Sequence, residues 1–208
     1  MTYQLYYNEA TKAKCHPETL HIDTSGTITP LFEAYWMLNL PIPEDGFMAV
    51  ISPEFERKTR RPITTIHQQL KRVNCDIMIP RNAIRSTTNQ WYAAERWHHG
   101  FVARSAVALA RAGLFDYILK PGYLLYSNFF WMRVEHWHQY RKELERLVSA
   151  MDEFKMFTDN CPHQTSSGHT KEQLMKATGF NHYTWYPFIC ERLIGSFMAD
   201  KKLKIGYL

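Results

Sequence analysis

The amino-acid sequence predicts a single α/β domain of three layers, with helices on both faces of a mostly parallel sheet. Two observations indicate this fold class. Short apolar segments of strand length alternate with segments of helical periodicity along the 208 residues, and no linker rich in glycine, proline or serine divides them. Such an alternating order is typical of Rossmann-like domains, and the length suits one domain, so we expect residues 1–208 to form one unit.

The first half of the chain supplies three predicted strands and two predicted helices. The opening segment TYQLYY is aromatic, ends at the turn-forming Asn8, and predicts the first strand. Residues 31–39 carry apolar side chains at helical spacing and stop before a proline, which predicts a short helix. The apolar runs at 46–52 and 75–80 are typical of strands buried on both faces, and Pro62 opens a helix between them.

The second half continues the same alternation. A long helical pattern covers residues 89–112 with one glycine inside it, and the segment GYLLYSNFFWMRV at 122–134 predicts another strand. A highly charged helix is expected over residues 136–157. A further helix is capped by Thr170 and ends at Gly179.

Composition indicates a cytoplasmic protein with reduced thiols. The four cysteines are scattered, without the close spacing of a disulfide scaffold. The first twenty residues do not match a secretory signal, and no apolar stretch approaches the roughly 18 residues of a membrane span. We therefore expect no membrane span.

Positive charge is concentrated in one part of the chain. The net charge is +5 and the sequence pI is about 9.0. This balance indicates a polyanionic partner, or else a solvated basic face. The clustered residues are Arg57, Lys58, Arg60, Arg61, Lys71, Arg72, Arg81 and Arg85.

No phosphate-binding glycine motif is present, because neither GxGxxG nor GxxxxGK[ST] occurs. A series of other motifs stands in a definite order: YYNEA, HIDTSG, FEAYWML, ISPEFERKT, CDIMIP, AERWHHGF, YSNFFWM and PFICERLIGSFM. In this order they resemble a family of short GT-A-like glycosyltransferases of bacteria and large viruses, which includes the amino-terminal glycosyltransferase domain of a chlorella virus protein. The resemblance implies a GT-A-type fold and a nucleotide-sugar donor, a UDP-sugar above all, bound at the carboxyl ends of the parallel strands.

The resemblance also implies a divalent metal, Mn or Mg, held by an Asp-x-Asp motif. The matching segment here is Asn74-Cys75-Asp76, so that Asp76 alone supplies a carboxylate and a metal would need other oxygen ligands. Metal dependence therefore stays open. Asp76 is expected to contact the metal or the ribose, with a strand-end cap as the alternative.

Further residues are expected to bind the donor. Lys58 is the first candidate for the diphosphate, with Arg60 and Arg61 as alternates, because negative charge accumulates on this leaving group. Tyr6 and Tyr7 close the first strand, where an aromatic face could stack on a uracil ring or belong to the core.

Two glutamates are candidate catalytic groups. Glu33 lies in an apolar stretch and could serve as a base or bind a sugar hydroxyl, although it also suits the polar face of a helix. Glu191 and Arg192 are adjacent in an apolar helix, where they could bind sugar or phosphate or pair internally.

Histidine and asparagine side chains complete the candidate site. His98 is a candidate phosphate or acceptor contact, or a half-buried structural histidine. Asn128 lies within an apolar segment, where a buried amide needs a hydrogen-bond partner and a donor sugar is one candidate. Cys161, His163 and His169 are of zinc-binding type, but their spacing matches no structural zinc pattern.

The sequence thus predicts an enzyme that transfers a hexosyl or pentosyl group from a nucleotide sugar to a glycan or to a modified base in DNA. The alternative is a nucleic-acid-binding module without catalysis, favoured by the basic pI and the abundant aromatic residues. An inactive relative that only binds a sugar nucleotide is a third hypothesis. A transferase needs its polar residues to converge on one pocket, which a pure binder does not.

Overall fold

The computed structural model describes residues 1–79, 89–125, 128–162 and 169–207. Arg81 and Arg85 of the basic cluster, and His163 of the zinc hypothesis, lie outside the described residues. Within the described residues, no helix has both the length and the apolar character needed to cross a membrane.

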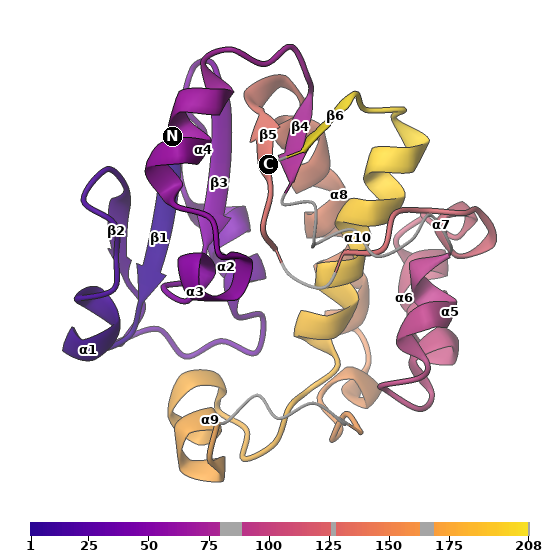
Figure 1. The fold of residues 1–208 in the computed structure, drawn as a ribbon. Helices are drawn as coiled ribbons and strands as arrows, with labels where there is room; N and C mark the ends of the chain where they lie inside the picture. The colour runs from indigo at the N-terminus through magenta and orange to yellow at the C-terminus, as the bar shows by residue number, and fades with distance from the viewer. Residues whose placement is uncertain (80–88, 126–127, 163–168, 208) are drawn as a thin grey trace.

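A six-stranded mixed sheet forms the centre of the fold (Figure 1). The strand order is β2-β1-β3-β5-β4-β6, and β5 is antiparallel to both of its neighbours while the other pairs are parallel. The predicted α/β class with a mostly parallel sheet is therefore confirmed, and the arrangement is compatible with a Rossmann-like domain. The strands are β1 (Thr2–Tyr6), β2 (Leu20–Asp23), β3 (Phe47–Ile51), β4 (Ile77–Ile79), β5 (Trp131–Arg133) and β6 (Ile205–Tyr207).

Helices and one short 3-10 turn connect these strands. In the described part of the chain they are α1 (Glu9–Lys12), α2 (Glu33–Asn39), α3 (Phe55–Thr59), α4 (Ile63–Leu70), α5 (Gln90–Ala94), α6 (Phe101–Arg111), α7 (Asp116–Leu119), α8 (Val134–Asp152), η1 (Lys155–Phe157), α9 (Lys171–Thr178) and α10 (Tyr186–Asp200).

The alternation of side chains along β3 divides the core between the two faces of the sheet. Met48 and Val50 belong to the larger cluster, with α2, α8 and α10, whereas Ala49 and Ile51 belong to a smaller cluster with α3 and α4. The indole Nε1 of Trp137 in α8 donates a hydrogen bond of 2.8 Å to the Met48 carbonyl. Helices thus cover both faces, as the three-layer prediction requires.

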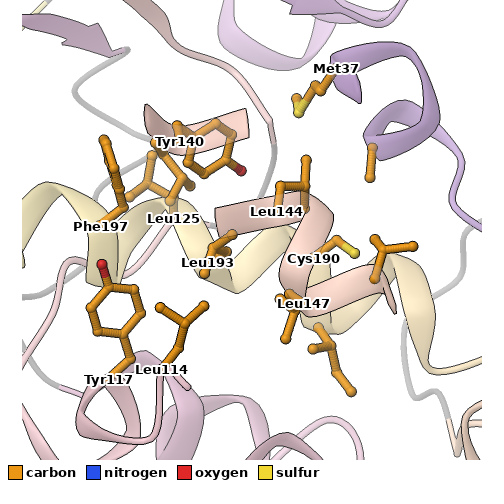
Figure 2. Close-up of a cluster of buried hydrophobic side chains, with 14 of the residues drawn as sticks. Met37, Leu114, Tyr117, Leu125, Tyr140, Leu144, Leu147, Cys190, Leu193 and Phe197 are labelled. Atoms are coloured by element: carbon orange, nitrogen blue, oxygen red, sulfur yellow. The ribbon is translucent and has the colours of Figure 1, made fainter. Parts of the chain in front are cut away.

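The larger cluster joins α2, α7, α8 and α10 into one apolar body (Figure 2). Side chains of all four helices meet there, so that α10, which carries two candidate site residues, is fixed against the layer that covers the sheet. The labelled residues are Met37, Leu114, Tyr117, Leu125, Tyr140, Leu144, Leu147, Cys190, Leu193 and Phe197.

The backbone at Tyr123 closely approaches the middle of α10 at Gly195. A Cβ atom added to Gly195 would lie 1.9 Å from the Tyr123 carbonyl oxygen and 2.2 Å from the Oε1 atom of the buried Gln90. The Tyr123 amide donates to the Gly195 carbonyl over 3.1 Å, and the Gln90 amide donates to the Ser196 hydroxyl over 3.1 Å. Only glycine leaves room for this contact.

The predicted strand at 122–134 is the largest error in the sequence reading. Among the residues of this segment that the structure describes, Trp131–Arg133 alone forms strand β5, and α8 begins at once, at Val134. The early part of the segment instead contacts α10, where Tyr123 bonds to Gly195, so its apolar character reflects packing against a helix. The charged helix also ends sooner than predicted, at Asp152, and a separate 3-10 turn follows it.

Candidate functional site

A pocket of about 220 Å³ opens among α2, α3, α10 and the segments around α9. Acidic, basic, amide and aromatic side chains line it together, and they come from parts of the chain that are far apart in sequence. The lining residues are Phe32, Glu33, Lys58, Asn128, Phe129, His169, Tyr183, Pro187, Phe188 and Glu191.

Strand direction explains why these segments meet. In Figure 1, β1 and β3 run toward the end of the sheet where α3 and α9 lie. Lys58 follows β3, whereas Asn128 precedes β5, which runs the opposite way. Both residues therefore lie at the carboxyl edge of the parallel strands, where open α/β sheets bind ligands.

Two carboxyl groups face this pocket. Glu33 begins α2 and is half-buried, and burial raises the pKa of its carboxyl group. A hydrogen bond from its own backbone amide lowers this pKa, the neighbouring Glu191 carboxylate raises it, and the Lys58 ammonium lowers it. A like-charged pair in one partly enclosed site favours retention of a proton.

Arg192 holds Glu191 in place from behind the pocket. Its Nη1 atom donates to Glu191 Oε2 over 2.6 Å and to the Leu125 carbonyl over 3.2 Å, and its side chain is only 3% exposed. The internal pairing that the sequence left open is therefore present. Arg192 is a positioning residue for Glu191 and does not line the pocket.

Lys58 supplies a positive charge at the pocket. Its ammonium nitrogen lies 5.7 Å from the centroid of the Phe129 ring. No described carboxylate forms a salt bridge with it, whereas its neighbour Arg57 and the more distant Lys14 both bind Glu54. Lys58 is thus placed to attract an anion.

Asn128 lines the same pocket and carries a buried polar atom. Its Oδ1 atom is buried and has no hydrogen-bond partner among the described residues. A buried acceptor without a donor costs about 1–3 kcal/mol.

Sequence reasoning missed the aromatic side of the pocket. His169 Nδ1 and the Tyr183 hydroxyl share a hydrogen bond of 2.7 Å, and the Phe32 ring stacks on Tyr183 at 6.1 Å between centroids. Burial and then the Lys58 charge lower the pKa of His169. The sequence singled out His169 only as a zinc-type residue, and nothing in its spacing to Tyr183 indicated this pair.

Phe32 also has a strained backbone. Its φ of 50° lies in the left-handed region that non-glycine residues rarely adopt. Such strain persists where surrounding structure enforces it, and it is concentrated at functional sites. The strained residue directly precedes Glu33 and fixes how α2 enters the pocket.

Three other predicted residues lie outside the lining. His98 is buried, within 3.1 Å of the Pro162 carbonyl oxygen through Nδ1, and its ring centroid lies 4.2 Å from that of Phe188. It therefore supports the pocket wall from the inside. Tyr6 and Tyr7 lie at the carboxyl end of β1, at the same edge of the sheet but not in the pocket.

Asp76 lies at the other edge of the sheet, because it precedes β4, which is parallel to β6 and opposed to β5. Its Oδ2 atom accepts a hydrogen bond of 2.7 Å from the Lys204 amide, and Oδ1 lies 3.6 Å from His136 Nε2. This geometry matches the strand-end cap rather than the metal or ribose contact. We predicted a position near the donor for Asp76 because the apolar segment at 75–80 indicates a strand but not the direction in which that strand runs.

The metal implied by the resemblance does not fit Asp76, whose carboxylate is engaged with the protein far from the pocket. Within the described residues, no group of three or more histidine, cysteine, aspartate or glutamate side chains is arranged to hold a metal ion.

Comparison of the chain with protein-family models, with curated proteins and with solved structures finds no match. The fold and the pocket therefore carry the functional argument.

Proposed function

We propose that this protein is a glycosyltransferase that uses a nucleotide sugar, a UDP-sugar in the first instance, and that its sugar-binding site is the pocket around Glu33 and Glu191. One observation carries the proposal. Four residues selected from sequence for this chemistry, Glu33, Lys58, Asn128 and Glu191, converge on a single pocket at the carboxyl edge of the parallel strands.

Each lining group suits one part of the reaction. Lys58 offers positive charge for the departing diphosphate, where negative charge grows as the bond to the sugar breaks. Glu33, Glu191 and Asn128 offer hydrogen bonds to sugar hydroxyl groups. The aromatic residues give apolar surface for the C–H faces of a sugar ring.

The size of the pocket supports a small occupant. Its volume of about 220 Å³ is below the roughly 300–1,000 Å³ of pockets that enclose a drug-sized ligand. The pocket therefore suits the sugar ring, and the nucleotide extends along the adjoining surface. Tyr6 and Tyr7 lie at this edge of the sheet and remain candidates to stack on the base.

A second candidate is a nucleic-acid-binding module. Arg60 and Arg61 directly follow α3, are exposed, and form no salt bridge with any described carboxylate. Exposed guanidinium groups of this kind suit phosphate backbones. In a transferase the same surface suits a modified base in DNA as acceptor, whereas a glycan acceptor makes no use of it.

Calorimetry with UDP and with UDP-, GDP- and dTDP-sugars, with and without manganese, tests the proposal. One nucleotide class is expected to bind the wild type, and Lys58→Ala and Asn128→Ala are expected to weaken that binding about tenfold or more. Lys71→Ala, at the exposed end of α4, is the matched control, and Asp76→Ala is expected to bind normally. Absence of nucleotide binding in every condition would refute the proposal.

The acceptor is tested by the salt dependence of binding or transfer. A DNA acceptor or a nucleic-acid-binding module gives a steep loss of affinity between low and moderate salt, because phosphate contacts release counterions. Replacing both Arg60 and Arg61 with alanine is then expected to flatten that dependence. A flat dependence in the wild type favours a glycan.

A further inference from the structure

The two carboxyl groups of the pocket have unequal surroundings. Glu191 Oε2 accepts a hydrogen bond of 2.6 Å from the Arg192 guanidinium, which is almost fully buried. Among the described residues, no basic side chain lies at hydrogen-bond or salt-bridge distance from the Glu33 carboxyl group. A guanidinium at hydrogen-bond distance strongly favours the ionised carboxylate.

The backbone amide of Glu33 favours the ionised form of its carboxyl group, but burial outweighs it, and the other groups around the pair do not reverse the difference. Lys58 from α3 is exposed, so solvent screens its attraction for Glu33. His169, ahead of α9, has a pKa lowered by burial and is neutral at pH 7. Tyr140 from α8 is a neutral phenol, because burial raises its pKa, and Asn128 carries no charge.

Two carboxylates that interact in one partly enclosed pocket favour retention of one proton between them. We propose that this proton resides on Glu33 and that Glu191 stays ionised, so that the pocket offers one hydrogen-bond donor and one charged acceptor to its ligand. Arg192 favours this division of charge through its hydrogen bond to Glu191, although the Arg192 side chain does not line the pocket.

The division predicts what the pocket binds. A ligand must present an oxygen that accepts from the Glu33 carboxyl group and a hydroxyl that donates to Glu191, as neutral sugar rings do. The next step rests on the proposed function. Glu191 takes the proton from an acceptor hydroxyl group, and the oxygen of that hydroxyl group forms a bond to the anomeric carbon of the donor sugar. The bond from that carbon to the diphosphate oxygen breaks, and its electron pair leaves with the nucleotide.

Carboxyl titration by NMR tests the division in the ligand-free protein. Protein labelled with ¹³C at glutamate side chains is titrated from pH 3 to pH 9, and Glu33→Gln and Glu191→Gln assign the two signals. Glu33 is expected to ionise at a higher pH than Glu191. Ionisation of Glu33 at or below the pH of Glu191 overturns the inference.

A second variant tests the part played by Arg192. Arg192→Lys keeps a positive charge and is expected to keep the order of ionisation. Arg192→Gln is expected to move the Glu191 titration to higher pH; an unmoved Glu191 signal in a folded Arg192→Gln protein counts against the inference. If Arg192→Gln does not fold, the wild-type order of ionisation still decides the question.

Ligand binding supplies an independent readout. For whichever of UDP-, GDP- or dTDP-glucose binds the wild type, Glu33→Gln is expected to lose less affinity than Glu191→Gln, because the amide still donates a hydrogen bond. Glu191→Gln is expected to lose about tenfold or more, because a charged acceptor is lost. Equal losses contradict the division. If none of these sugars binds, the proposed function fails, while the titration still decides the proton's place.

Discussion

Gly195 is the position where a single methyl group has the largest predicted effect on the fold. In Gly195→Ala the new Cβ atom meets the Tyr123 carbonyl oxygen at 1.9 Å and Gln90 Oε1 at 2.2 Å, whereas ordinary contacts begin near 3.4 Å. The Tyr123 contact involves backbone, which cannot rotate away. The segment around Tyr123 must therefore move away from α10 by more than an ångström.

That movement has a cost that the structure allows us to approximate. Overpacking a well-packed core costs about 1–3 kcal/mol. Displacing the Tyr123 amide from the Gly195 carbonyl, now at 3.1 Å, adds about 1 kcal/mol. A total near 3 kcal/mol corresponds to a fall in Tm of about 6–12 °C for a chain of this length.

Differential scanning calorimetry measures this change directly. Gly26→Ala is the matched control, because a Cβ atom there meets nothing within 4 Å, and removing a glycine at such a site is neutral or slightly stabilising. If Gly195→Ala melts within about 2 °C of the wild type, the close approach of Tyr123 to α10 is not a constraint, and the placement of α10 against that segment has to be revised.

Further predictions concern titration and the core. Glu33→Gln is expected to raise Tm at pH 7. The folded protein raises the pKa of Glu33, so the wild type loses stability as the pH rises above 4.5, the ordinary pKa of this carboxyl group. The gain in Tm should vanish below about pH 4, and an equal gain there would contradict the reasoning. Burial lowers the pKa of His67 from 6.5, so the neutral imidazole contributes its full stability above pH 6.5 and that stability is lost as the pH falls. In urea unfolding from pH 7.5 to pH 5, the free energy of unfolding should decline less steeply for His67→Gln than for the wild type. Parallel declines in the two proteins would argue against this burial effect. Trp137→Phe removes the 2.8 Å bond to the Met48 carbonyl and should cost about 1–2 kcal/mol in the same assay, whereas unchanged stability would show that water replaces the indole.

The buried strands were predictable because their apolar character is continuous. The run around β3 is buried at every position, so its composition alone identified it. Strand β2 was missed because it lies at the sheet edge with mostly exposed side chains, and its sequence LHID therefore lacks an apolar signal. Strand β6 was missed for the same reason, since its residues are only partly buried.

The candidate site was partly predictable for a related reason. Glu33, Asn128 and Glu191 are polar residues in apolar surroundings, a pattern that is costly unless it serves a purpose. Asp76 shows the same pattern, yet it caps the amino end of β4, because composition does not reveal which edge of a sheet a residue occupies. Tyr183 gave no signal, since its part in the pocket depends on how the chain around α9 folds back.

The position of β5 between β3 and β4 has a consequence for how the sheet is completed. Because β5 joins β3 to β4, the strands β2, β1 and β3 on one side and β4 and β6 on the other become one sheet only when it inserts. Asn128 reaches the pocket through that insertion, and Glu191 arrives on a helix still later in the chain. The polar residues that line the pocket therefore come together only when the sheet is complete: without β5 docked, Glu33 and Lys58 lack Asn128 beside them.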